Sequence, residues 1–369
     1  MHTVLKTTLI ATAIGAGLLS IDSTRAAASG PRVDEQRAVG AFSAIDVSGP
    51  FDLTVQARGA HGVTVHGERD QLEQVETFVR GDTLVVRPGG RTTWTFGYTP
   101  PRRHVTLSVS APQLARLRMS GSGDVTLDQV AGERIALTND GPGDLRVAGQ
   151  VRALALRVTG SGDAHLERLR ARQVELTMAG PGDVELADID GELQARIDGS
   201  GDLAAHRLAL ARLDLRLSGP GNAVLRGAVT DFMAQVNGSG DLDGAGLQVA
   251  RAGVVLRGPG DVALRRVSDT LDADLRGSGD LQATLAGTHL LFTSSGPGNA
   301  ELRGQVTTVR ARLSGSGTLD GRRLQAGRAD IAVTGPGTAT VHVTGQDSAN
   351  RSRSDLLVVD RRGSSQVPD

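Results

Sequence analysis

A four-residue motif, Gly-[Ser/Pro]-Gly-[Asp/Asn/Thr], recurs every 19 or 20 residues and constrains the fold more than any other feature of the sequence. The second residue alternates strictly between Ser and Pro from one copy to the next. Such regular spacing predicts a single structural unit that is stacked many times along one axis. The twelve copies begin at Gly121, Gly141, Gly160, Gly180, Gly199, Gly219, Gly238, Gly258, Gly277, Gly296, Gly315 and Gly335.

Each copy of the repeat predicts short β-strands. In the copy that begins at Asp183, Val184 and Leu186 alternate with polar residues, and Leu193 and Ile197 continue the pattern. Alternation with period two indicates a strand, and the lack of a helical pattern between copies excludes βαβ units and leucine-rich repeats. We therefore predict an all-β fold, a parallel β-solenoid of twelve repeats with an N-terminal β cap. The glycines are expected to supply positive φ at the corners.

The number of copies in one coil is left open by the repeat. Twelve coils of one copy would form a rod about 58 Å long, and six coils of two copies a rod about 29 Å long. Identical turns stack best on identical turns, which favours pairing a Ser copy with a Pro copy. A 39-residue coil, however, would have to fill a wide interior with Leu, Val and Ala alone, so we favour one copy per coil.

The flanking segments differ from the repeat. Residues 1–28 resemble an export signal, because a positive start precedes the apolar stretch 7–21 and small residues allow cleavage after Ala28 or Ala26. That stretch is shorter than the about 20 residues of a transmembrane helix. The sequence then predicts a linker at 29–39, the cap at 40–118 with strands near 43–47, 51–57, 62–67, 83–88 and 104–109, the solenoid at 119–345 and a polar tail at 346–369. The apolar run 356–359 is expected to cover the last coil.

Composition narrows the function classes. The net charge of −1 argues against nucleic-acid binding, which requires a basic surface. The lack of Cys excludes disulfides, thiolate zinc sites and a Cys nucleophile. No apolar run of membrane length follows the export signal, so no membrane span is expected in the mature chain.

The fourth residue of the motif is the clearest candidate for a ligand. Stacked coils would align these side chains, which could form a calcium ladder, or each could accept a hydrogen bond from backbone N–H groups in the turn. We favour the second interpretation, because one carboxylate per copy is few for calcium and Thr is a poor ligand. No metal and no cofactor are expected. The series consists of Asp124, Asp144, Asp163, Asp183, Asp202, Asn222, Asp241, Asp261, Asp280, Asn299, Thr318 and Thr338.

Catalytic residues are not predicted. Parallel β-helix lyases and hydrolases need a local break in the repeat where acids and bases converge, and this repeat has none. The histidines are scattered, and His165 and His206 follow repeat turns, where we expect them simply to lie on the surface. We therefore expect that the protein is not an enzyme.

An aromatic stripe in the cap is the most specific binding candidate. Trp94, Phe96 and Tyr98 are spaced i, i+2, i+4, which places all three on one face of a strand, and Arg102 and Arg103 follow. Such a face could stack a sugar ring or contact a protein partner. The alternative, which is the commoner fate of large aromatic residues, is that the stripe packs on the first coil as part of the core.

Three stretches of the sequence carry a resemblance to a known family. They are AFSAIDVSGPFDLTVQ, GERDQLEQVETFVRGDTLVVRP and VTLSVSAPQLARLRMSGSGDVTL. Together with the repeat, over residues 40–345, the chain resembles the putative auto-transporter adhesin head GIN-domain family. The resemblance implies an exported β-solenoid of the bacterial envelope and implies no catalytic residues.

The function predicted from these features is that of a non-enzymatic envelope protein, an adhesin-like binding or structural module. Its partner would be a glycan or an envelope protein, in the periplasm, on the outer surface or outside the cell. One alternative is a periplasmic scaffold without an external ligand. Another is a calcium-dependent or carbohydrate-active β-helix protein.

Overall fold

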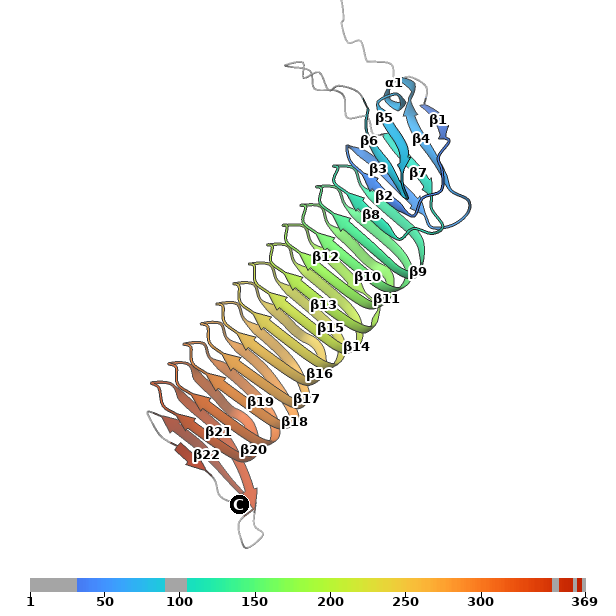
Figure 1. The fold of residues 1–369 in the computed structure, drawn as a ribbon. Coiled ribbons are helices and arrows are strands. Elements are labelled where there is room, and N and C mark those ends of the chain that lie inside the picture. The colour runs from blue at the N-terminus through green and yellow to red at the C-terminus, as the bar shows by residue number, and fades with distance from the viewer. Residues whose placement is uncertain (1–31, 90–104, 347–351, 361–363, 367–369) are drawn as a thin grey trace, which may run out of the picture.

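The protein is a long rod of stacked β coils with a small antiparallel region at its N-terminal end (Figure 1). The structure is a computed structural model that describes residues 32–89, 105–346, 352–360 and 364–366. Successive coils pair in parallel along the rod, which confirms the predicted all-β solenoid. The strands of the coils are β9 (Val125–Asn139), β10 (Leu145–Val158), β11 (Ala164–Met178), β12 (Val184–Ala187), β13 (Ile189–Ile197), β14 (Leu203–Leu217), β15 (Ala223–Val236), β16 (Leu242–Leu256), β17 (Val262–Leu275), β18 (Leu281–Ser294), β19 (Ala300–Leu313), β20 (Thr318–Val333) and β21 (Thr338–Gln346).

Each coil contains one copy of the motif. Leu145 pairs with Ala164, and Ala164 in turn pairs with Val184, so neighbouring coils are offset by one copy rather than two. The favoured interpretation of the repeat is therefore confirmed. Ser and Pro copies alternate along the rod and stack on one another.

The inward side chains of one coil fall into three short segments, as β14 illustrates. In each segment alternate residues are buried, and two exposed or half-buried residues in succession separate one segment from the next. The chain changes direction at these two places, at 206–207 and 211–212, and again at the glycine corner. The buried residues of this coil are Leu203, Ala205, Leu208, Leu210, Leu213, Leu215 and Leu217. Equivalent residues of all coils form one continuous core.

The first of these bends absorbs the difference between 19- and 20-residue copies. Arg146 pairs with His165 and Ala148 pairs with Arg168, so two residues of β11 lie opposite one residue of β10. This is a β-bulge. Leu166 is buried in the core, which leaves Glu167 as the additional residue of the bulge.

The N-terminal region joins the solenoid directly. β2 (Ala44–Val47) and β3 (Phe51–Gln56) pair in parallel with β8 (Arg116–Met119) and β9, as a coil would. The predicted strands of this region correspond to β2, β3, β4, β6 and β7, whereas β1, β5, β8 and a one-turn helix were not predicted. The remaining elements are β1 (Arg32–Arg37), β4 (Gly62–Glu68), α1 (Arg69–Leu72), β5 (Val75–Arg80), β6 (Thr83–Pro88) and β7 (Val105–Ser110).

The C-terminal end of the rod is covered by an antiparallel strand. β22 (Ser352–Asp360) pairs with β21, and β23 (Ser364–Gln366) pairs with β20. Val359 is buried and Leu357 packs against the core, so the run 356–359 covers the last coil as predicted. An antiparallel partner also satisfies the backbone groups that the last coil would otherwise leave unpaired.

The corner glycines do not adopt the predicted positive φ. None of the twelve has a φ between +20° and +160°, so that expectation is wrong. Their role is close approach between coils. A Cβ at Gly199 would overlap the carbonyl oxygen of Gly180, and Gly180 accepts a hydrogen bond from the N–H of Gly201 at 3.3 Å. Left-handed glycines occur instead at the first bend, at Gly149 and Gly227 among others.

We predict that Gly199→Val destabilises the solenoid far more than Asp202→Asn. The valine side chain would overlap backbone atoms of the preceding coil, which cannot move without breaking the corner, whereas Asn keeps the oxygen of Asp202 that accepts a hydrogen bond. Thermal unfolding followed by circular dichroism measures both variants. Equal losses in melting temperature would contradict the close-approach role of the corner glycine.

Candidate functional site

The column of Asp, Asn and Thr residues forms a hydrogen-bonded ladder along the rod. The N–H of Asp202 donates to Asp183 Oδ1 at 2.8 Å, and the N–H of Asn222 donates to Asp202 Oδ1 at 2.7 Å. The same bond links each successive pair of coils, in eleven steps from Asp52 to Thr318. The side chains are hydrogen-bond acceptors, as we favoured, but their donors belong to the next coil rather than to the same turn.

The ladder explains why Asp and Asn interchange in this column. Both side chains present an Oδ1 that accepts the N–H of the next coil, as Asn222 does for Asp241 at 2.9 Å. One oxygen of each carboxylate is thus already committed within the protein. The ladder also begins earlier than the repeat in the sequence, because Gly49, Phe51 and Asp52 take the places of Gly, Gly and Asp in the motif. The pattern Gly-Pro-Phe-Asp at 49–52 could have shown this.

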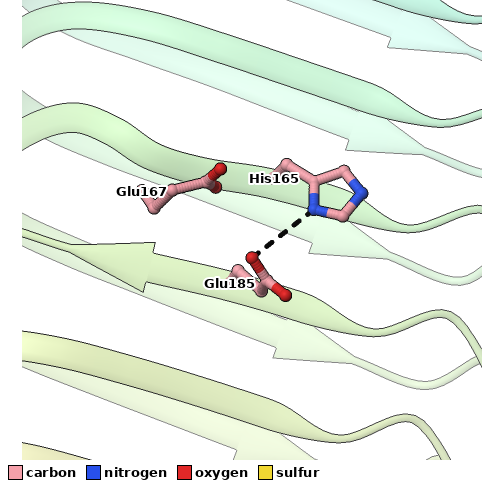
Figure 2. Close-up of side chains that lie close together, drawn as sticks. All are labelled: His165, Glu167 and Glu185. Carbon is pink, nitrogen blue, oxygen red and sulfur yellow. Dashed lines mark ion pairs between the residues drawn. The ribbon is translucent and has the colours of Figure 1, made fainter.

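A second group of polar side chains meets on the outer surface of two neighbouring coils (Figure 2). His165 and Glu167 lie on β11, and Glu185 lies beside His165 on β12. The Nδ1 atom of His165 is 3.6 Å from Glu185 Oε2, and one ligand atom from each of the three residues lies within 4.8 Å of the others. Figure 2 shows both carboxylates directed toward the imidazole. His165, which we expected simply to lie on the surface, is therefore part of a three-residue cluster.

The surroundings of this cluster are irregular for the solenoid. The coil divides into β12 and β13 at Asp188, and Asp188 and Arg207 both have positive φ, 54° and 52°, which non-glycine residues rarely adopt. The repeat therefore does contain a local break, contrary to the sequence-based prediction. The sequence did not reveal this break, because Asp188 and Arg207 lie at positions where the length of the copies varies.

Arg207 spans the break. Its guanidinium donates to both carboxylate oxygens of Asp188, at 2.8 and 3.1 Å, and to the backbone oxygen of Glu167 at 3.1 Å. The hydrogen bond from Arg207 and its charge hold the pKa of Asp188 below the ordinary 3.8, although partial desolvation opposes the shift. The same pairing raises the pKa of Arg207. The pair is therefore ionised at neutral pH.

A shallow hollow marks the outer face formed by the last segments of the coils. It has a volume of about 430 Å³ and extends across successive coils from Arg134 to Asp214. Its lining combines small residues with charged and amide side chains, and the latter include Gln173, Glu192 and Arg212. Such a surface can offer hydrogen bonds to a polar ligand that lies along the rod.

The other residues singled out in the sequence have different outcomes. The twelve corner glycines all lie at the contacts between coils. The predicted export signal lies outside the described residues. So do the aromatic stripe and the arginines after it, which are Trp94, Phe96, Tyr98, Arg102 and Arg103. Within the described ranges, no helix is both long and apolar enough to cross a membrane.

The sequence profile of one family matches almost the whole chain beyond its first forty residues. The matches cover residues 41–206, 187–284 and 268–354, and the family is described as putative auto-transporter adhesin, head GIN domain. The chain belongs to this GIN-domain family. Among curated proteins, no relative of the chain is found.

Three solved structures similar to this GIN-domain protein come from Bacteroides fragilis and Parabacteroides distasonis. A putative adhesin from Bacteroides fragilis has a TM-score of 0.33 at 14% identity, covering 77% of this chain and 98% of its own. A putative adhesin from Parabacteroides distasonis has a TM-score of 0.39 at 17% identity, covering 79% and 97%. A protein of the same organism titled putative lipid binding protein has a TM-score of 0.40 at 17% identity, covering 79% and 96%.

We predict that calcium is not required for folding. The acceptor oxygens of the ladder are satisfied by backbone N–H groups, so calcium would gain few ligands and would compete with the bonds that join the coils. Chelator-treated protein should keep its β-sheet circular dichroism and melting temperature, and millimolar calcium should leave both unchanged. A collapse on chelation that calcium reverses would contradict this prediction.

Proposed function

We propose that this GIN-domain protein is an exported, non-enzymatic module of the bacterial envelope that acts by binding, in the manner of an adhesin. The observation that supports this most is the uninterrupted core and hydrogen-bonded ladder, which make the rod stiff over its length. A stiff rod keeps its two ends apart and holds a long outer face in a fixed shape. Both properties serve attachment and display.

The outer face supports the binding role. The hollow between Arg134 and Asp214 is open and polar, and its guanidinium, carboxylate and amide groups can form hydrogen bonds with the hydroxyl groups of a glycan or with a protein backbone. Binding across several coils adds many weak contacts rather than one deep site. The partner that we propose is therefore a glycan or an envelope protein.

The aromatic stripe is proposed as the strongest single contact for such a partner. Trp94 and Tyr98 are the only Trp and Tyr of the chain, and Arg102 and Arg103 follow them. Contacts that dominate binding energy are enriched in Trp, Tyr and Arg. The faces of the repeat, by contrast, are built largely from aliphatic, small and charged residues.

Export can be tested by the position of the mature N-terminus. Cleavage of the proposed signal should give a chain that starts at Ser29 or Ala27, found by N-terminal sequencing of the protein from the envelope fraction. Labelling of intact cells with an impermeant reagent then distinguishes an outer-surface adhesin, which is labelled, from a periplasmic scaffold, which is labelled only after lysis. Recovery of a chain that begins at Met1 would contradict export.

We predict that Trp94→Ala lowers capture of the partner while leaving the melting temperature nearly unchanged. Glycan arrays and pulldown of envelope proteins measure capture per folded molecule. Phe232→Ala is the control for loss of a core aromatic, because Phe232 is fully buried, and it should cost about 3–5 kcal/mol of stability. If Trp94→Ala instead destabilises the protein as much as Phe232→Ala and capture is unchanged, the stripe belongs to the core.

A further inference from the structure

We propose that His165, Glu167 and Glu185 form a binding site for a divalent transition-metal ion, with Zn²⁺ as the ion that fits best. The proposal concerns the wall of the solenoid and does not depend on the partner proposed above. It starts from the types of ligand that the cluster offers. One imidazole nitrogen and two carboxylate oxygens are a set that zinc accepts, whereas calcium and magnesium prefer oxygen ligands alone.

The distances are close to those that a metal site needs. Two ligands of a tetrahedral zinc ion are about 3.4 Å apart, given zinc–ligand bonds of about 2.0–2.2 Å. His165 Nδ1 and Glu185 Oε2 are already 3.6 Å apart, and all three ligand atoms are within 4.8 Å of one another. Small rotations of the half-exposed Glu185 side chain would complete the approach. Three protein ligands leave a fourth position for water or for a donor group of a bound partner.

Glu167 gives an independent indication of a missing partner. Glu167 is half-buried, and its Oε2 atom is buried with no hydrogen-bond partner among the residues that the structure describes, although buried carboxylate oxygens are normally paired. The residue is also the additional member of the bulge in β11. Bulges are frequent beside functional sites, where they redirect a side chain. Here the bulge leaves Glu167 on the same outer surface as His165.

The charges around the cluster favour a cation. Asp188 and Arg207 neutralise each other, and Arg146, which lies beside His165 in the preceding coil, forms ion pairs with Asp124 and Asp144. Within the described ranges, neither Glu167 nor Glu185 has an arginine within ion-pair distance.

The cluster thus combines two carboxylates with an imidazole, and the nearest guanidinium, that of Arg207, acts on Glu167 only through its field and is hydrogen-bonded to Asp188. On the other side of Glu185 the next coil presents Ala204, a small residue that brings no competing charge.

Zinc binding by the chelator-treated mature protein tests the proposal. Calorimetric titration with Zn²⁺ alone should show one saturable site per chain, and His165→Ala, Glu167→Gln and Glu185→Gln should each weaken binding by at least about tenfold. Co²⁺ titration adds a spectroscopic measurement, because a visible absorption band should appear with the unaltered protein and disappear with His165→Ala. Ca²⁺ should not compete at equal concentration.

Two matched variants serve as controls. His289 is an exposed histidine whose neighbours in the adjoining coils are Thr270 and Thr308, and Glu301 occupies the position of Glu185 in a later coil, with Gln282 and Asp320 beside it. His289→Ala and Glu301→Gln should bind Zn²⁺ as the unaltered protein does. The proposal is overturned if no saturable site is found, or if the three cluster variants bind Zn²⁺ as tightly as these controls while all remain folded by circular dichroism.

Discussion

The close contact between backbones at the glycine corner is the constraint on which the rest of the structure depends. Gly180 and Gly199 lie so near each other that no side chain fits between them, and the carbonyl oxygen of Gly180 is free to accept a hydrogen bond from the next coil. The same glycine-to-glycine hydrogen bond recurs at each step of the repeat from Gly141 to Gly337. The constant spacing then allows the same strand, the same core layer and the same turn to be repeated along the whole rod.

The carboxylate ladder depends on that spacing. Because the corners are stacked on one another, Asp202 Oδ1 accepts a hydrogen bond from the backbone N–H of Asn222, and the side-chain amide of Asn222 donates a second one to the same oxygen. The ladder adds a row of side chain–backbone bonds to the backbone pairing of the strands, and charge-assisted hydrogen bonds of this kind are stronger than neutral ones. The ladder therefore stabilises the stacking of the coils. Ligand sites are expected on the other outer surfaces of the rod.

Irregularity enters where the copies differ in length. A 20-residue copy places an additional residue at the first bend, and in β11 this residue is Glu167. In the next two coils, Asp188 and Arg207 have positive φ. The Arg207 side chain donates hydrogen bonds to Asp188 and to the backbone oxygen of Glu167, and so connects three coils. Backbone conformations of this kind are retained only where the surroundings stabilise them, and they are often found at functional sites. The cluster around His165 lies at this irregularity.

The sequence by itself determined the repeat, the parallel β-solenoid, the inward residues and the acceptor role of the Asp and Asn column. These follow from local rules, because alternation and spacing are properties of the chain that any stacked arrangement must respect. It could not determine why the glycines are needed, since close approach and positive φ demand the same residue. The tertiary structure decided the rest: the hydrogen-bond partners of Asp202, the bulge at Glu167 and the contact between His165 and Glu185. Each depends on how one coil lies on the next, about 4.8 Å away, and residues 19 or 20 positions apart become neighbours only when that register is fixed.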